Sequence, residues 1–206
     1  MVAASSNAKV TIHMGREFPL SEANFKLISE IAYKLTGIKL SDHKKNMIYS
    51  RLSRRIRQRD LSSFDAYCKL ISTPGNDEMT DFVNAITTNL TAFFRESHHF
   101  EYLQSVVFPY LMKTNASSKR IRIWSAGCST GEEPYTLSIC VKEKLPVDRW
   151  DIKILATDLD TNVVEHGKRG EYDEDRIEGL ESARKKRWFL KGSGDQVRVK
   201  PSLQEL

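Results

Sequence analysis

Residues Ile121–Leu137 read IRIWSAGCSTGEEPYTL, and this stretch decides the fold. It starts with alternating apolar and polar residues, passes through small residues and two acids, and continues with the pattern of a helix. The sequence therefore predicts a strand, a loop containing Gly127 and Gly131, and a helix. Two interpretations of the loop are open. It matches G-x-S-x-G, which presents a nucleophilic serine in α/β-hydrolases, and it also suits a loop that approaches a nucleotide.

The residues that follow continue the alternation of strand and helix. We expect a second strand over 150–156, which ends in ATDLD, and a second helix over 161–168. This β-α-β-α order begins a doubly wound α/β sheet, whose ligands bind at the carboxyl ends of the strands. The glycine loop and Asp158 should therefore face the same crevice. Asp158 comes about 27 residues after Gly131, close to the spacing at which an acid meets ribose hydroxyls.

The hydrolase interpretation lacks its partner residues. A serine triad in that fold needs an Asp and then a His after the nucleophile, each on its own strand-end loop. His166 is the only histidine downstream of Ser129, and it lies six residues past Asp160 on a predicted helix. Ser129 is therefore not expected to be a nucleophile.

The double acid Glu132-Glu133 points to the kind of cofactor. Two carboxylates at a helix N-terminus would repel the phosphates of a dinucleotide. They suit a cofactor with a cationic amino acid end and no phosphate, such as S-adenosylmethionine. The alternative is that both acids only complement the helix dipole.

Upstream of the loop the pattern is helical. We expect a flexible N-terminus over 1–16, an all-helical docking or lid domain over 17–89 and a linker with a helix over 90–119. Ser21 should cap the first helix and Gly37 should end it. The linker helix should bend or restart near Pro109. The inward residues of the first helix are expected to be Phe25, Ile28, Ile31, Ala32 and Leu35.

One helix of that domain is strongly basic. Lys44–Arg59 holds seven Lys and Arg residues and no acid, while Ile48, Leu52 and Ile56 form an apolar stripe. Arg51, Arg54 and Arg55 share another face. A solvated charged face is the simpler interpretation. Because seven cations without an interleaved acid repel one another, we favour an acidic partner; nucleic acid would also fit.

Composition limits the remaining functions. The 206-residue chain has no apolar run of the roughly 18 residues that a membrane span needs, and its N-terminus lacks the apolar core of a signal peptide. Three cysteines without a CxxC spacing indicate reduced thiols and a cytoplasmic protein. His98 and His99 are adjacent and cannot easily share a metal, so no metal is expected.

Three motifs in this order resemble the chemotaxis-receptor methyltransferases, the CheR family: TTNLTAFFRE (Thr87–Glu96), WSAGCSTGEEPYTL (Trp124–Leu137) and ATDLD (Ala156–Asp160). The similarity covers nearly the whole chain. It implies a Rossmann-like methyltransferase domain over 120–206, with part of a small antiparallel β subdomain over 188–206. It also implies an enzyme that uses S-adenosylmethionine, leaves S-adenosylhomocysteine and methylates glutamate side chains of membrane chemoreceptors, in sensory adaptation.

The resemblance also assigns residues. Arg95 is implied as catalytic, and the basic helix as the part that docks on the helical cytoplasmic region of the receptor, through Arg51, Arg54 and Arg55. Glu133, rather than Glu132, would face the amino acid end of the cofactor, and Asp158 would bind its ribose. The implied cofactor-binding residues are Asn89, Thr91, Arg95, Ala126, Gly127, Glu133 and Asp158.

Family members continue with further strands, so we expect this chain to lack part of the fold. Two other functional classes stay open: a methyltransferase that acts on nucleic acid, suggested by a pI near 9.0, and a non-catalytic binding fragment. We expect a monomer without nucleic acid as partner and without direct membrane insertion.

Overall fold

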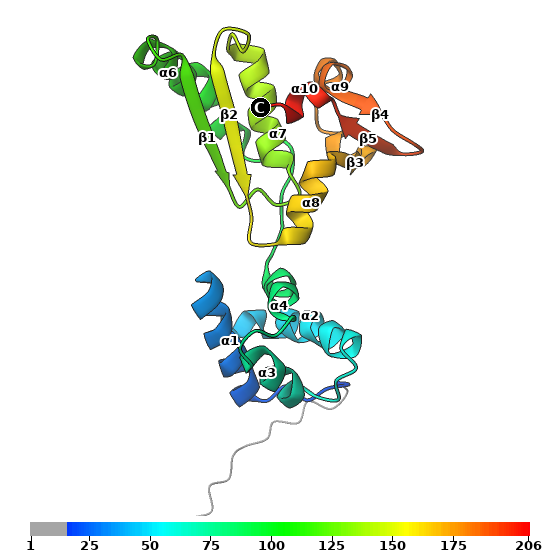
Figure 1. Cartoon of the computed structure of the whole chain (residues 1–206). Coiled ribbons are helices and arrows are strands. Elements are labelled where there is room, and N and C mark those ends of the chain that lie inside the picture. Colours follow the sequence, from blue (N-terminus) through cyan, green and yellow to red (C-terminus); the bar gives the residue numbers. More distant parts are fainter. Residues whose placement is uncertain (1–15) are drawn as a thin grey trace, which may run out of the picture. The chain divides into compact units, whose positions relative to one another are not determined.

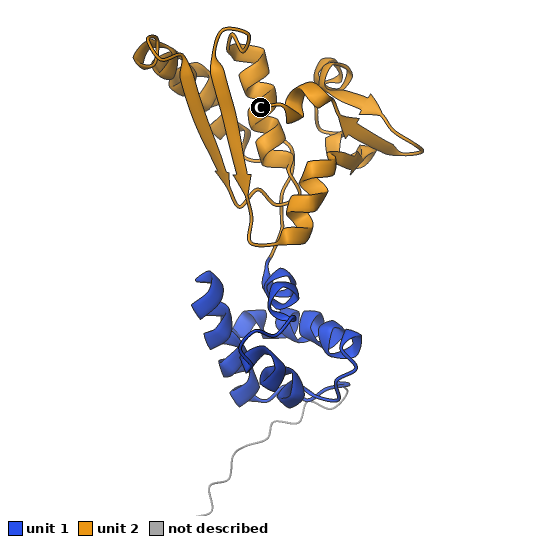
Figure 2. Ribbon diagram, viewed as in Figure 1, with its two compact units in different colours: residues 1–87 blue, residues 88–206 orange. Residues whose placement is uncertain are grey.

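The structure is a computed structural model that describes residues 16–206 (Figure 1). The flexible N-terminus predicted over 1–16 lies, apart from Arg16, outside the described residues. The chain divides into two compact units, Met1–Thr87 and Thr88–Leu206 (Figure 2). The boundary therefore falls just after the last helix of the helical region, two residues before the end of the domain expected over 17–89. The predicted linker over 90–119 instead belongs to the second unit.

In its described residues the first unit is a bundle of four α-helices: α1 (Glu22–Thr36), α2 (Lys45–Gln58), α3 (Phe64–Ser72) and α4 (Met79–Ile86). A short 3-10 turn over Asp42–Lys44 precedes α2. The predicted cap residues are confirmed: the Ser21 hydroxyl accepts a hydrogen bond from the Asn24 amide, and Gly37 ends α1 in the left-handed conformation.

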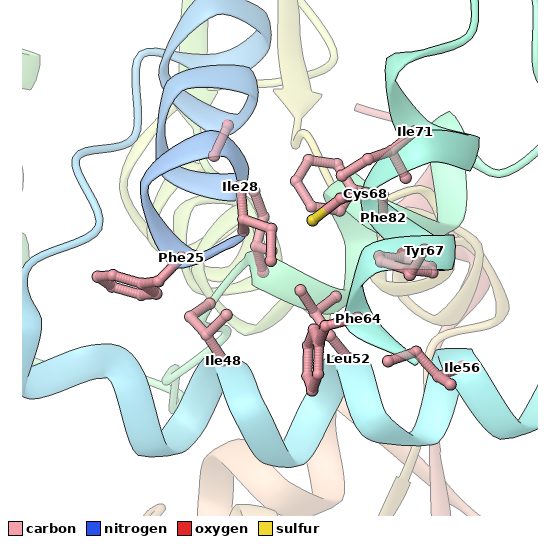
Figure 3. Close-up of a cluster of buried hydrophobic side chains, with 12 residues drawn as sticks. Phe25, Ile28, Ile48, Leu52, Ile56, Phe64, Tyr67, Cys68, Ile71 and Phe82 are labelled. Atoms are coloured by element: carbon pink, nitrogen blue, oxygen red, sulfur yellow. The ribbon is translucent and has the colours of Figure 1, made fainter. Parts of the chain in front are cut away.

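The core of this unit confirms the apolar stripe of the basic helix. Ile48, Leu52 and Ile56 are fully buried and point toward side chains from α1, α3 and α4 (Figure 3). The expectation for Leu35 is wrong. It remains 47% exposed, because it lies in the last turn of α1, on a side that no other described element of this unit covers.

The second unit begins with a helical segment that is not a free linker. Its elements are α5 (Ser97–Tyr102), a π-helical turn (Leu103–Val107) and α6 (Phe108–Thr114). The π turn ends two residues before Pro109, which has no N–H to donate, so the predicted irregularity near this proline is confirmed. Phe100 and Phe108 pack into one core with Ile121 and Ile152 of the sheet, which explains why the segment belongs to this unit.

The predicted strand and helix alternation follows: β1 (Arg120–Ala126), α7 (Glu132–Lys144), β2 (Asp151–Thr157) and α8 (Thr161–Arg169). β1 and β2 are parallel and in register from Arg120 opposite Asp151 to Ala126 opposite Thr157. Their carboxyl ends therefore meet at one edge, as the doubly wound pattern requires.

A small antiparallel sheet of order β3-β5-β4 completes the unit, from β3 (Glu171–Asp173), β4 (Phe189–Lys191) and β5 (Gln196–Val199). The pairing of β4 with β5 confirms the predicted subdomain, while β3 was not predicted. A 3-10 turn over Glu174–Ile177, α9 (Ser182–Trp188) and α10 (Pro201–Gln204) accompany it.

α7 lies between these two sheets and holds them together. Leu137, Cys140 and Val141 pack in the core formed with β1 and β2, whereas Tyr135 and Ile139 pack in the core formed with the small sheet. Every residue from Tyr135 to Val141 is buried. The first turn of α7 is consequently held in place from both sides, and the glycine loop leads directly into it.

Candidate cofactor site

The glycine loop is fastened to the end of the neighbouring strand. The backbone amides of Gly127 and Cys128 both donate to the carbonyl oxygen of Thr157, at 2.8 and 2.9 Å. Gly127, Ser129 and Gly131 have φ values of 86°, 49° and 100°, in the left-handed region that favours glycine. The loop is thus a tight turn that starts where β1 ends and is held at the end of β2.

Gly131 is needed for a close approach as well as for its conformation. A Cβ at this position would stand 2.8 Å from the Tyr172 hydroxyl and 2.9 Å from the Cα atom of Gly167. Tyr172 itself donates its hydroxyl to the Thr130 carbonyl at 2.8 Å. The small sheet and α8 therefore pack directly on the loop, and only a residue without a side chain fits between them.

Asp158 lies at the end of β2 and binds the same loop. Its Oδ2 accepts from the Ser129 amide at 2.8 Å, and its Oδ1 accepts from the Asp160 amide at 2.9 Å. Two carboxylate oxygens offer about four acceptor positions, so each keeps capacity for a further donor. The side chain is half-buried at the strand ends. The acid is thus held in one orientation while it can still accept hydrogen bonds from a ligand.

The two adjacent acids of α7 have different environments. Glu132 is buried and forms an ion pair with Arg176, and it also accepts from the Thr130 hydroxyl at 2.6 Å. Glu133 is exposed and accepts a hydrogen bond from Ser125 at 2.6 Å. Of the two acids, Glu133 is therefore the one that a ligand can reach.

The segment Asn89–Arg95 is attached to the cofactor site within the second unit. The side-chain amide of Asn89 donates through Nδ2 to Oδ2 of Asp160 at 2.7 Å. The Asp160 side chain also caps α8. Phe93 makes edge contacts with the rings of Tyr172 and Phe189. Phe93 is thereby buried in the core of the second unit.

Arg95 is exposed, and its guanidinium donates to the carbonyl oxygen of Leu90 at 2.8 Å. Neither of the nearby acids, Glu96 and Glu101, pairs with it among the described residues. Phe94 and Glu96 on either side have φ values of 52° and 57°. The Arg95 side chain therefore folds back on its own segment.

Ser129 has none of the surroundings of a nucleophile. Its hydroxyl is buried and has no hydrogen-bond partner in the described part of the chain. The imidazole of His166 instead packs on the ring of Tyr172, with 5.5 Å between centroids. The cysteines are equally unsuited to nucleophilic chemistry, since burial raises the pKa of Cys68 to about 11 and that of Cys140 to about 12.

The basic helix is less free than its sequence suggests. Arg55 donates to both carboxylate oxygens of Glu78, at 2.8 and 2.7 Å, and Arg51 donates to the Ala85 carbonyl at 3.2 Å. The premise of seven mutually repelling cations is therefore wrong, because acids at the start of α4 lie against α2. Of the three predicted docking residues, Arg54 is exposed and has no polar partner in residues 16–206.

Sequence reasoning missed several residues that shape the site. Asp160 fixes Asn89, and Arg176 bonds to both Glu132 and the carbonyl oxygen of Thr91. Asp160 belongs to the ATDLD motif and could have been considered there. Arg176 and Tyr172 carry no local signal, since their roles depend on the packing of the small sheet.

The described residues offer neither a metal site nor a membrane-spanning helix. Within 16–206, no group of three or more His, Cys, Asp and Glu side chains is arranged to hold a metal ion. None of the helices in this range is long and apolar enough to cross a bilayer.

The geometry suits a cationic cofactor without phosphate. A Cβ added to Gly127 would have no other atom of the described protein within 4 Å, apart from Gly127 and its two neighbours in the chain. The loop therefore leaves space beside its backbone. The two accessible acids near the carboxyl ends of β1 and β2, Glu133 and Asp158, bring negative charge, which favours a sulfonium and an ammonium group over phosphates. A Rossmann-like βαβα unit with this acidic loop defines the class of S-adenosylmethionine-dependent methyltransferases.

Comparison with known proteins places the chain within that class. Residues 89–206 match the model of the "CheR methyltransferase, SAM binding domain", and residues 23–87 match the "CheR methyltransferase, all-alpha domain". The chain belongs to the CheR methyltransferase family, and its cofactor is S-adenosylmethionine. The domain matches meet at the boundary between the two compact units.

Curated relatives carry the same activity in their names. The chain is 42% identical over 195 residues to chemotaxis protein methyltransferase 2 of Pseudomonas aeruginosa, covering 93% of this chain and 68% of the relative. It is 38% identical over 198 residues to the chemotaxis protein methyltransferase of Escherichia coli, covering 93% and 66%. The chain thus spans about two thirds of the length of these relatives.

Proposed function

We propose that the protein methylates glutamate side chains of membrane chemoreceptors in the cytoplasm and forms γ-glutamyl methyl esters. One observation carries the proposal: two acidic side chains that a ligand can reach, Glu133 and Asp158, lie near the carboxyl ends of β1 and β2. Relatives that are 38–42% identical are named chemotaxis protein methyltransferases, and this name supports a chemoreceptor as the substrate.

Each predicted residue takes a definite part in this proposal. Asp158 accepts hydrogen bonds from the ribose hydroxyls, since its two oxygens are already oriented by Ser129 and Asp160. Glu133 binds the amino acid end of the cofactor. Ala126 and Gly127 offer backbone next to the cofactor, where no side chain intervenes. Asn89 and Thr91 border the site from the segment that Asp160 and Arg176 hold.

When bound, the cofactor would supply a methyl group on a sulfonium to a glutamate carboxylate of the receptor: the new O–CH3 bond would replace the S–CH3 bond, and neutral S-adenosylhomocysteine would leave. Both charges shrink during this displacement, so the protein has to align the reactants and exclude water, and a strong base is not required. Arg95 is proposed to leave the Leu90 carbonyl and to orient the substrate carboxylate with its two-pronged guanidinium. This accounts for a site without a histidine or cysteine nucleophile.

We assign docking on the receptor to α2, but to fewer of its arginines than the sequence suggests. Arg54 is exposed and uncommitted in the described chain, whereas Arg51 and Arg55 have partners within the bundle. We therefore propose Arg54 as the contact to acidic side chains of the receptor, with electrostatic attraction that accelerates association.

The test is transfer of a deuterated methyl group from S-adenosylmethionine to receptor-containing membranes, followed by mass spectrometry of receptor peptides. Base-labile methyl esters on glutamate are expected with the whole protein, and about tenfold to a hundredfold fewer with an Asp158→Ala variant at a limiting cofactor concentration. Nucleic acid is added to the same reaction, and its methylation would favour nucleic acid as the substrate. Cofactor binding without transfer to any substrate would favour a non-catalytic module.

A further inference from the structure

The side chain of Arg176, from the 3-10 turn after β3, reaches the cofactor site from the small sheet. One of its terminal nitrogens, Nη2, donates to the Thr91 carbonyl at 2.9 Å and also forms the ion pair with Glu132. Thr91 and Glu132 lie 41 positions apart in the sequence and belong to different elements. A single guanidinium therefore joins the segment Asn89–Arg95 to the first turn of α7.

This ion pair differs from the exposed pairs that contribute little to proteins. The Glu132 side chain is 1% exposed, and its second oxygen is occupied by the Thr130 hydroxyl at 2.6 Å. A buried carboxylate without its partner would be strongly unfavourable, so the position of Arg176 is well determined. The Thr91 carbonyl is fixed as a consequence.

A second contact holds the same segment further along. The Phe94 amide donates to the Thr136 hydroxyl at 3.1 Å, and that hydroxyl donates to the Glu132 carbonyl at 2.7 Å. The segment is thus tied to α7 on both sides of Ala92, and both connections pass through Glu132. The residue that follows Phe94 is Arg95.

We propose that Arg176 is a positioning residue of the methyl-transfer site, which holds the segment Thr91–Arg95 against the first turn of α7. This inference rests on the proposed function, in which that segment borders the cofactor and carries Arg95. It gives the small sheet a role in cofactor binding, because its connection between β3 and α9 contributes the Arg176 side chain. Arg176 acts through Thr91 and needs no contact with the cofactor.

The test combines two measurements on the whole protein. Arg176→Met removes the donors and keeps most of the apolar stem. We expect about tenfold weaker binding of S-adenosylhomocysteine in calorimetry, the factor that corresponds to 1.4 kcal/mol. Faster hydrogen exchange is expected in the peptide that contains the Phe94 and Arg95 amides. Arg176→Lys should give intermediate values, since an ammonium retains three donors.

The double variant Arg176→Met/Glu132→Met separates positioning from mere stability. Arg176→Met alone leaves a buried carboxylate unpaired and should lower the melting temperature. In the double variant the carboxylate is removed as well, so much of the lost melting temperature should be restored. Cofactor affinity and slow hydrogen exchange should not return, because the Thr91 carbonyl still lacks its donor. Recovery of affinity together with stability would overturn the proposal.

Arg198→Met is the matched control. Arg198 lies on β5 of the same small sheet, and its exposed side chain makes no hydrogen bond or ion pair within residues 16–206. Its replacement should leave both measurements unchanged, and an effect equal to that of Arg176→Met would contradict the proposal. Neither measurement depends on a receptor. If the wild-type protein transfers no methyl group to receptors, the proposed function fails, while the affinity and exchange data still decide the role of Arg176.

Discussion

The Asp158 carboxylate lies 2.8 Å from the Ser129 amide nitrogen, so the acid that ends β2 accepts a hydrogen bond from the loop that follows β1. This contact orients Asp158 before any cofactor arrives. A substitution at Asp158 therefore removes the hydrogen bond that holds the loop at Ser129, together with the carboxylate that would bind the cofactor.

Asp158→Ala is expected to weaken binding of S-adenosylhomocysteine by about tenfold to a hundredfold. Hydrogen bonds to a charged acceptor are worth about 1.5–3 kcal/mol, and each 1.4 kcal/mol is a factor of ten. Calorimetry on the whole protein measures the change. Asp148→Ala, at an exposed acid before β2, serves as control and should bind as the wild type does. Unchanged affinity of the Asp158→Ala variant would show that Asp158 does not bind the cofactor.

Gly131→Ala should destabilise the second unit by about 1–3 kcal/mol, because its φ of 100° is strained for alanine. The new methyl group would also stand 2.8 Å from the Tyr172 hydroxyl. Gly179→Ala is the matched control, since nothing lies within 4 Å of its added Cβ and its φ is not in the left-handed region. Thermal denaturation of both variants checks this prediction, and equal stabilities would show that the loop adapts to a side chain.

Arg95→Ala and Arg95→Lys are both expected to lower turnover about a hundredfold, the scale of loss when a reactant is misplaced. Lysine keeps the charge but loses the planar fork. Stability should change by less than about 0.5 kcal/mol, since the side chain is exposed and bonds only to the Leu90 carbonyl among the described residues. Initial rates of methyl transfer give the test. Full activity of Arg95→Lys would show that alignment by a guanidinium is unnecessary.

Reversal of charge on α2 should separate docking from stability. Arg54→Glu is expected to slow receptor methylation at low ionic strength, mostly through slower association, and to leave cofactor affinity and stability unchanged. Arg55→Glu should instead destabilise the first unit by about 3 kcal/mol, because it removes a partner of the buried Glu78. Methylation rates at two salt concentrations, with thermal denaturation, distinguish these effects. Strong duplex DNA binding that Arg54→Glu abolishes would favour a nucleic-acid partner.

The ion-pair cluster around Glu78 should make the first unit sensitive to acid. Burial alone would raise the pKa of Glu78, but hydrogen bonds from Arg55, Arg59 and Tyr67 outweigh burial and lower this pKa below its usual value. A lowered folded-state pKa adds stability above the unfolded value of about 4.3. That contribution is lost as the pH falls through the folded pKa.

Glu78→Gln should therefore be less stable than the wild type at pH 7, and the difference should shrink as the pH falls below about 4. Urea denaturation between pH 7 and pH 3 measures it. A difference that stays constant over this range would mean that the ionised form of Glu78 does not contribute to stability.

The sequence by itself determined the features that depend on neighbouring residues. Helix α1 begins after Ser21 and ends before Gly37, because capping needs only the local backbone. Ile48, Leu52 and Ile56 are buried because a helix brings every fourth residue near one face. The order of strand, glycine loop, helix, strand and acid also follows the chain directly, and it was sufficient for the class of fold and the family resemblance.

Tertiary structure decided which of several similar residues serves which purpose. Glu132 and Glu133 are neighbours of the same type, yet only packing of the small sheet gives Glu132 its partner Arg176, 44 positions away. Arg55 meets Glu78 from 23 positions away, so a helix that reads as unpaired charge is partly neutralised. β3 is three residues long and exists through its pairing with β5. Such pairings depend on burial and on long-range packing, which local propensity does not encode.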